Sequence, residues 1–279
     1  MPRNCDLKMI EFLTTAGNLF AGNESTMIKM KPMGWAASLL TFGIPALAMG
    51  AGYYLLMPFL IKRGMLAYYA YSIALGLPLL CMLIASLAAY RAEDNPFTWR
   101  ALMTRFRFKL LSLRDLLIVA GIFAAEMAVY FLMTRLTGCL IAQNIIPIPA
   151  NIPDFLNPRS VWTQETIDVA TGGLKGNWPI LIFSVVLLVI NVVGEEFWWR
   201  GLVLPRQQLA FAAGTLAVHS TLWTLFHAFK YWDLLNLLPL SIGLTFAVIL
   251  LNNSSAGLMM HFISNGVGLI PILLGVLDK

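Results

Sequence analysis

The chain has 279 residues, of which 59% are hydrophobic and 12% charged, and its net charge is +5. Soluble domains carry about 25% charged residues, so this composition, with a mean hydropathy of +0.75, excludes a soluble protein and indicates an integral membrane protein. The basic residues fall in short loops between apolar runs, where membrane topology explains them better than a nucleic-acid partner does. The three cysteines form no CxxC pair and predict neither disulfides nor a metal site.

The N-terminal stretch mixes charged and apolar side chains without a continuous apolar core, so it is not typical of a signal peptide. We expect an interfacial segment over residues 1–33 and peripheral helices and loops over residues 34–175. A catalytic-type core is expected over residues 176–279. Together these parts are predicted to form one integral membrane domain.

Seven apolar runs are long enough, or nearly so, to cross a bilayer as helices, which takes about 20 residues. They are Gly34–Ile61, Gly64–Tyr90, Leu116–Thr134, Trp178–Leu204, Leu209–Phe229, Leu234–Leu251 and Ser254–Leu277. Leu140–Ala150 or the N-terminal segment can supply an eighth, re-entrant or interfacial piece. Because an open sheet cannot satisfy its backbone in lipid, we predict an all-α, polytopic helical membrane protein. It is expected to have seven to eight transmembrane helices and a polar intramembrane cavity.

The loop charges predict an N-terminus in the cytoplasm and a location in the plasma or inner membrane. The stretch Arg91–Arg114 holds six basic residues, and lysine and arginine accumulate on the cytoplasmic side of membrane proteins. Aromatic residues such as Phe97 and Trp99 interleave these charges, so part of the stretch is expected to lie on the membrane surface. The linker Arg135–Asn177, rich in proline and asparagine, is then outside and is expected to be an irregular loop.

Ionisable residues are rare in the C-terminal part of the chain, and they cluster. Between Trp178 and Gly275 they are Glu195, Glu196, Arg200, Arg206, His219, His227, Lys230, Asp233 and His261. Ionisable groups at membrane depth are costly and mark functional sites by default. The alternative interpretation is that the two glutamates only cap a span at the interface.

The spacing of these residues favours a site. Glu196 and Arg200 are four residues apart, so they share a helical face and can pair. Glu195 points about 100° away and is left for another helix, which suits a general base. Trp223–His227 puts an indole and an imidazole on one face, and His261–Asn265 does so for an imidazole and an amide. An imidazole and an amide can both donate hydrogen bonds to a developing oxyanion.

Helix lengths predict whether these groups lie at one depth. At 1.5 Å per residue, Glu195 lies about 25 Å from the outer end of its span. His261 and Asn265 lie about 10 to 17 Å from the inner end of theirs, which agrees. His227 comes out about 24 Å from the inner end of its span. It therefore joins the cluster only if Arg206–Ala213 rises into the membrane or the helices tilt.

At these residues the sequence resembles the family of CAAX-type and bacteriocin-processing (CPBP) intramembrane proteases, which includes the type II CAAX prenyl endopeptidases. The family motif EExxxR is met by Glu195–Arg200, and HxxxN is met by His261–Asn265. FxxxH is approximated by Trp223–His227, where a tryptophan replaces the phenylalanine. The motifs occur in the family's order on predicted spans, and the resemblance covers Trp178–Gly275.

The resemblance implies a glutamate-dependent intramembrane endopeptidase. By this resemblance, Glu195 would activate a water molecule with the help of His227. His261 and Asn265 would hold the tetrahedral oxyanion. The implied substrate is a membrane-associated protein or peptide, and nothing in the sequence identifies a prenyl group on it.

The same resemblance gives the neighbouring residues supporting roles. Glu196 and Arg200 would organise the site, while Trp223 and Trp199 are candidate substrate contacts. Two further polar residues match no motif. His219 is expected to have a polar packing role, and Glu126 is expected to pair with a basic neighbour or to face water.

Other classes remain as alternatives. A zinc-dependent protease is the nearest one, because two histidines and one glutamate often hold catalytic zinc, but the sequence lacks HExxH. We therefore expect no metal and no other cofactor. Ser220, Ser264 and Cys81 lie near no predicted base, which disfavours nucleophilic catalysis. A non-catalytic scaffold or bacteriocin-immunity-type protein of the same family is possible, whereas a transporter is disfavoured by the lack of an inverted repeat.

Overall fold

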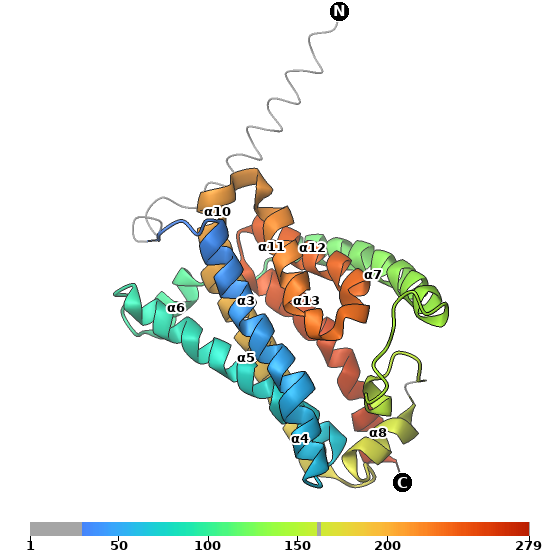
Figure 1. Cartoon of the computed structure of the whole chain (residues 1–279). Coiled ribbons are helices and arrows are strands. Elements are labelled where there is room, and N and C mark those ends of the chain that lie inside the picture. The colour runs from blue at the N-terminus through green and yellow to red at the C-terminus, as the bar shows by residue number, and fades with distance from the viewer. Residues whose placement is uncertain (1–29, 161–162, 279) are drawn as a thin grey trace, which may run out of the picture.

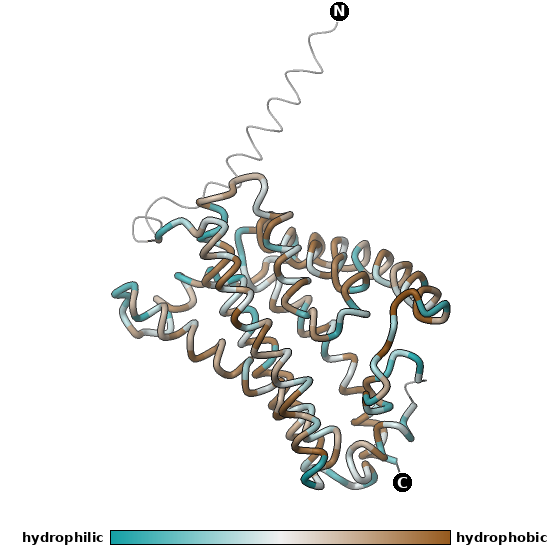
Figure 2. Tube along the Cα trace, in the orientation of Figure 1, coloured by the Kyte–Doolittle hydropathy of each residue, from teal (hydrophilic) through white to brown (hydrophobic). Residues whose placement is uncertain are grey.

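The computed structural model describes residues 30–160 and 163–278. Within these ranges the chain forms helices and turns and contains no strand, which confirms the predicted all-α class (Figure 1). Most of the expected interfacial segment, residues 1–29, lies outside the described part. Apolar residues predominate along the long helices (Figure 2), and many large apolar side chains are exposed, which is the pattern of a protein surrounded by lipid.

Within residues 30–160 and 163–278, six helical segments are long and apolar enough to cross a membrane, so the chain is an integral membrane protein. They are Trp35–Lys62, Ala67–Ala92, Leu113–Ala142, Trp178–Phe226, Ala228–Leu251 and Ser254–Leu277. The count among the described residues thus differs slightly from the expected seven to eight. The fourth segment, Trp178–Phe226, joins two runs that the sequence analysis had separated, because no loop interrupts its 49 residues.

This fourth segment nevertheless turns back on itself. It begins as α9 (Trp178–Glu195), continues through the π-helix η3 (Glu196–Val203) and ends its first limb with α10 (Leu204–Phe211). A single turn of 3₁₀-helix, η4 (Ala212–Gly214), then leads into α11 (Thr215–Phe226), which packs against α10. Ala212 takes a positive φ of 47° at the reversal. Since α11 has only 12 residues, its length is about 18 Å, about half a bilayer.

The first two segments lie side by side on one flank of the molecule (Figure 1). The first contains α3 (Trp35–Ala51), the π-helix η1 (Gly52–Leu56) and α4 (Met57–Lys62). The second is α5 (Ala67–Ala92), which also packs along α9. Their outward faces are made of exposed aliphatic side chains such as those of Leu47 and Leu55.

The basic stretch after α5 was expected to lie partly on the membrane surface, but part of it is buried against the rest of the protein. It contains the short helix α6 (Trp99–Arg105). Arg105 donates to Glu93 from Nε at 2.7 Å and from Nη2 at 2.6 Å, and from Nη1 to the carbonyl oxygen of Gly201 at 3.1 Å. Arg206 donates to the same carboxylate. We call Glu93, Arg105 and Arg206 the rim cluster, because they lie at the end of the α5 span.

The rim cluster affects the pKa of its carboxylate. Burial alone would raise the pKa of Glu93, but the guanidinium groups of Arg105 and Arg206 hold it below its ordinary value. Of the interleaved aromatic residues, Phe97 and Trp99 are exposed, as expected for a membrane surface, whereas Phe106 is buried. The stretch therefore docks α6 onto the C-terminal half of the protein.

The segment that was expected to be an irregular loop is partly helical. α7 (Leu113–Ala142) extends into it beyond the predicted end at Thr134, and Leu140–Ala150 adds only a turn after this helix. The linker also contains η2 (Asp154–Leu156) and α8 (Gln164–Thr171). Thr163 caps α8, because its side chain accepts a hydrogen bond from the backbone N–H of Thr166. Local capping of this kind escaped the composition-based prediction.

The C-terminal helices surround the middle of the fourth segment. After the 3₁₀-helix η5 (Ala228–Asp233), α12 (Leu234–Leu251) packs against α7, α11 and α13 (Ser254–Gly266). α13 in turn contacts α9, η3 and α7, and the chain ends with η6 (Val267–Leu269) and α14 (Ile270–Leu277). This packing brings η3, α11 and α13 together.

Candidate functional site

A carboxylate at the start of η3 joins two helices. Nη1 of Arg200 donates to Oε1 of Glu196 at 3.0 Å, and both side chains are fully buried. Nδ1 of His261, on α13, lies 2.9 Å from the same oxygen. The pair predicted from the i,i+4 spacing is confirmed, and it has an additional partner that the spacing did not predict. We call Glu196, Arg200 and His261 the site cluster.

The hydrogen bonds of the site cluster continue along α13. A nitrogen that faces a carboxylate oxygen must donate, so neutral His261 carries its proton on Nδ1 and accepts at Nε2. Nδ2 of Asn265 lies 3.1 Å from that Nε2 and also donates to Oδ1 of Asn191, on α9, at 3.1 Å. Asn265 is exposed. A continuous polar chain thus runs from buried Arg200 to the surface of α13.

A glycine allows α13 to approach the carboxylate. A Cβ atom on Gly257 would lie 2.8 Å from Oε2 of Glu196, and 3.7 Å from Cγ of Arg200. Any larger residue would therefore push α13 away from η3. Because Gly257 precedes His261 by one helical turn, this close contact also sets the height of the imidazole beside Glu196.

The adjacent carboxylate has different surroundings. Glu195 is 2% exposed, and its Oε2 accepts a hydrogen bond of 2.9 Å from Nε1 of Trp223, on α11. Among the described residues it takes part in no salt bridge, whereas Glu196 is held by Arg200. The two neighbouring glutamates are thus divided between a neutral donor and a cation.

Trp223 is the centre of contact between the three helices. Its ring lies 4.5 Å from the ring of His227 and 6.0 Å from that of His261, both edge-on, measured between centroids. The guanidinium carbon of Arg200 lies 4.9 Å above the same indole, a cation–π geometry. Trp223 is 3% exposed, so its ring packs inside the site, where its N–H donates to Glu195.

His227 caps the end of α11 beside this indole. Its Nδ1 lies 3.0 Å from the backbone carbonyl oxygen of Trp223, and a carbonyl only accepts, so Nδ1 carries the proton. The other nitrogen, Nε2, is then an acceptor. The sequence analysis placed His227 at a different depth from the other site residues, and the structure removes this difference. The first limb runs on to Phe211 before the chain reverses. Glu195 and His227 are the same number of residues from Phe211, so they lie at a similar distance from the reversal. His227 and Glu195 consequently meet through Trp223.

Two other candidate residues lie in the core. Trp199 is fully buried and stacks on Phe42, with ring centroids 4.1 Å apart. This position does not favour the substrate contact that was expected for Trp199. His219 is also fully buried, and its Nδ1 lies 2.6 Å from Oε1 of Gln207, which agrees with the packing role expected for it.

Within residues 30–160 and 163–278, no group of three or more histidine, cysteine, aspartate or glutamate side chains is arranged to hold a metal ion. The nitrogens of His261 face a carboxylate and an amide. The rings of His227 and His261 both contact the indole of Trp223. The expectation that the protein needs no metal stays a prediction.

A comparison with protein families gives this region a name. Residues 177–267 match the family model described as type II CAAX prenyl endopeptidase Rce1-like. Over this segment the chain is similar to the Rce1-like family. No curated protein and no solved structure matches the chain. The family supports a CAAX-type membrane protease function.

The segment that matches the Rce1-like family contains all three motifs and their contacts. It starts at the first turn of α9 and ends just after α13. The indole at Trp223, where the family motif has a phenylalanine, provides the N–H that binds Glu195. The tryptophan therefore adds a hydrogen bond that phenylalanine cannot make.

Sequence reasoning missed two participants. Asn191 binds Asn265, and a signal for it existed, since it is the one amide within the apolar run that leads to Glu195, four residues before that carboxylate. The link between Glu196 and His261 had no sequence signal, because it joins residues that are far apart in the chain. Such contacts depend on the packing of α13 against η3.

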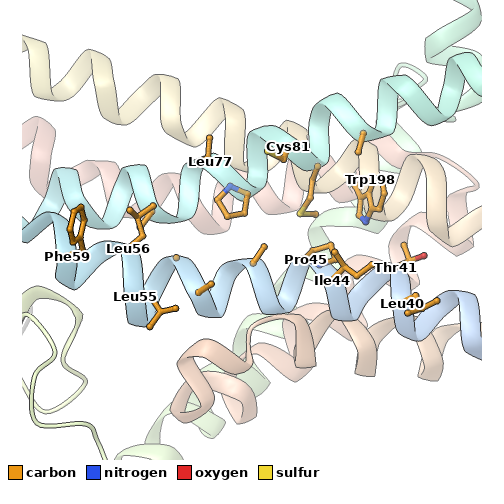
Figure 3. A pocket seen from close by; sticks show the side chains of 17 residues that line it. Leu40, Thr41, Ile44, Pro45, Leu55, Leu56, Phe59, Leu77, Cys81 and Trp198 are labelled. Carbon is orange, nitrogen blue, oxygen red and sulfur yellow. The ribbon is translucent and has the colours of Figure 1, made fainter.

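An apolar groove lies beside the site between the first two segments, with a volume of about 980 Å³. Figure 3 shows it between α3–α4 and α5, with Phe59 toward one end and Trp198 toward the other. Its lining is almost entirely apolar and includes Ile44, Leu55, Phe59, Leu77, Cys81 and Trp198. Trp198 follows Glu196 by two residues, so the groove reaches the helix that carries the carboxylates.

Proposed function

We propose that this protein is an intramembrane endopeptidase that hydrolyses a peptide bond with a water molecule activated by Glu195. The observation that carries the proposal is the division of the glutamate pair: Glu196 binds Arg200 and His261, while Glu195 is buried beside a neutral indole N–H. A carboxylate without a cationic partner keeps its basicity and can accept a proton from water. This arrangement supports a general base at Glu195.

His227, which contacts the indole of Trp223, would support the same chemistry. With its proton on Nδ1, its Nε2 has a lone pair that can accept a hydrogen bond from the attacking water. The ring is fixed by the bond to the Trp223 carbonyl and by its contact with the indole. His227 would thus orient the water that Glu195 deprotonates.

His261 and Asn265 would stabilise the oxyanion. The carboxylate of Glu196 holds the tautomer and ring orientation of His261, as an acid does in a catalytic triad, and His261 in turn holds the amide of Asn265. In the resting arrangement the amide of Asn265 is bonded to His261 and Asn191. Substrate binding would release one of these amide hydrogens toward the developing oxyanion.

The substrate would be a membrane-associated protein or peptide. The groove is too apolar to bind a charged chain, so it would hold an apolar part of the substrate while the scissile bond reaches Glu195. The predicted topology, with a cytoplasmic N-terminus in the plasma or inner membrane, opens the site toward the cytoplasm.

Comparison of peptide ends in membranes tests this function before any substrate is identified. Cells that express the wild-type protein or the Glu195→Ala variant at equal levels are compared by terminal proteomics, with Glu93→Ala as a control outside the site. We expect a set of membrane-protein fragments that is absent from Glu195→Ala and present in Glu93→Ala. If Glu195→Ala keeps both the fragments and the biological activity, a non-catalytic scaffold role is correct and the protease proposal fails.

The groove has its own test. Cys81 lies exposed in the groove and forms no disulfide, so Cys81→Trp fills the space from α5 without altering a charged residue. We expect this variant to lose the same fragments while its unfolding temperature stays near that of the wild type. Cys139→Trp, at another exposed cysteine on α7, is the matched control. Normal cleavage by Cys81→Trp would show that the substrate does not use the groove.

A further inference from the structure

A second buried carboxylate lies outside the three motifs. Glu126, in the middle of α7, is 5% exposed, and neither of its oxygens has a hydrogen-bond partner among the described residues. A buried polar group without a partner is costly, and inside a membrane it has no bulk water to bind. Such a group is retained only where it interacts with something that compensates for its burial.

The direction of the side chain shows that Glu126 faces the protein. A Cβ atom on Gly243 of α12 would lie 1.8 Å from Oε2 of Glu126, so only glycine at this position leaves room for the carboxylate. α7 and α12 pack closely along their length. The carboxylate therefore lies between two helices and points toward the centre of the bundle, away from lipid.

Arg200 of the site cluster has buried donors, as Glu126 has buried acceptors, without partners in the described part of the chain. Arg200 is fully buried, and it lies close to α12, as Glu126 does. A Cβ atom on Gly257 would lie 3.7 Å from Cγ of Arg200 and 2.8 Å from Cγ2 of Val248, which is on α12 with Gly243. Of the three guanidinium nitrogens of Arg200, Nη1 binds Glu196, while Nε and Nη2 have no partner among the described residues. Two buried nitrogens of Arg200 and two buried oxygens of Glu126, which carry opposite charges, are thus left without partners among the described residues.

We propose that Glu126 is a positioning residue for Arg200, coupled to Nε and Nη2 of the guanidinium across buried water. Groups that are beyond direct contact commonly satisfy each other through such water. The coupling would hold Arg200 from the α7 side, so that Nη1 stays on Glu196 and Glu196 stays on His261. α7, which contains none of the family motifs, would thereby control the geometry of the site.

The first test uses stability and needs no substrate. The unfolding temperatures of Glu126→Gln and Glu126→Leu are measured on the purified full-length protein in lipid nanodiscs. A carboxylate that is buried without compensation is improved by leucine, so both a neutral effect and a higher unfolding temperature for Glu126→Leu would overturn the proposal. Coupling to Arg200 predicts that both variants unfold at lower temperatures than the wild type.

A double-mutant cycle shows whether Arg200 is the partner. The shifts caused by Glu126→Gln and Arg200→Gln should not add, because the second change finds the interaction already lost. The control cycle pairs Glu126→Gln with Arg105→Gln of the rim cluster, and its shifts should add. Additive shifts in both cycles would overturn the coupling. If Arg200→Gln does not fold, the cycle is run with Arg200→Lys, and the sign test on Glu126 alone decides.

Activity separates positioning from simple support of the fold, and this part rests on the proposed function. We expect Glu126→Gln to lower kcat by about 10-fold with little change in KM, and Glu126→Asp to recover part of the loss. A change in KM alone would contradict a role at the site cluster. An inactive wild-type protein would refute the proposed function but leave the stability cycle valid, so the two failures are distinguishable.

Discussion

Two glutamate–arginine clusters in this protein differ in how completely their hydrogen bonds are satisfied. In the rim cluster, Arg105 uses all three nitrogens, and both oxygens of Glu93 are bonded. In the site cluster, Oε2 of Glu196 and two nitrogens of Arg200 have no partner among the described residues. In the rim cluster only Nε of Arg206 lacks a partner among the described residues, whereas the site cluster has three such atoms, Oε2 of Glu196 and Nε and Nη2 of Arg200.

This difference fits a division of labour. A satisfied ion cluster at a helix end fixes how α6 and α10 meet. An ion cluster with unpartnered buried atoms destabilises the fold. Such clusters are found mainly where the polar atoms have a function. The predictions below test this contrast, from the largest expected effect to the smallest.

Removal of the site-cluster cation should have the largest effect on stability. Arg200→Ala leaves Glu196 buried without its cation, and breaking a buried pair costs about 3–5 kcal/mol. Arg206→Ala removes a partly exposed arginine from a carboxylate that Arg105 still holds, so we expect about 1 kcal/mol or less. Chemical denaturation of the purified variants measures both. Equal losses would contradict the contrast between the two clusters.

Loss of the exposed amide should affect turnover more than binding. Asn265→Ala removes a proposed oxyanion donor, and removal of one such donor lowers kcat by about 100- to 1,000-fold. Steady-state kinetics on a substrate found by terminal proteomics would show this with KM nearly unchanged. Asn252→Ala, which removes an amide that binds Arg107 outside the site, is the control. A pure increase in KM for Asn265→Ala would exclude the oxyanion role.

Replacement of the central indole should have a smaller effect. Trp223→Phe keeps an aromatic ring but removes the hydrogen bond to Glu195, and hydrogen bonds to charged groups contribute about 1.5–3 kcal/mol. We expect kcat to fall by about 10-fold, because the carboxylate loses its orientation. Trp232→Phe, at another buried tryptophan, controls for loss of ring size. If both variants behave alike, the indole N–H has no special role.

The rim cluster should show its contribution through pH. Because the pKa of Glu93 is held below its ordinary value of 4.5, its stabilising effect is complete above that pH and disappears as the pH falls through the lowered pKa. The difference in unfolding temperature between wild type and Glu93→Gln should therefore be present at pH 7 and shrink below about pH 4. Thermal scans across pH measure it. A difference that grows in acid would contradict this pairing.

Local features of the site were accessible from the sequence, and features between helices were not. The Glu196–Arg200 pair follows from spacing alone, since residues four apart share a face. The contact of Glu196 with His261 depends on how closely α13 approaches η3 at Gly257, and no periodicity encodes that distance. The hydrogen bond from Trp223 to Glu195 was not foreseen for the same reason, and the substrate contact expected for Trp223 stays a prediction.

The fold shows the same division between local and global information. Apolar runs located the membrane helices, because length and composition decide whether a helix can cross lipid. They also separated Trp178–Leu204 from Leu209–Phe229, close to the reversal at Ala212, but they did not predict that α10 passes into α11 through a single turn. Hydropathy indicates whether a helix is surrounded by lipid or by water, whereas the residue at which the helix ends depends on a few backbone dihedral angles.

The central claim is that Glu195 activates the hydrolytic water while Glu196 is held by its cation. The most direct measurement is the cleavage rate of purified, reconstituted wild-type protein, Glu195→Gln and Glu93→Gln on one identified substrate. We predict that Glu195→Gln loses about 100-fold or more of the rate while it binds substrate and unfolds like the wild type, and that Glu93→Gln cleaves at a nearly normal rate at pH 7. Cleavage by Glu195→Gln at the wild-type rate would contradict the account.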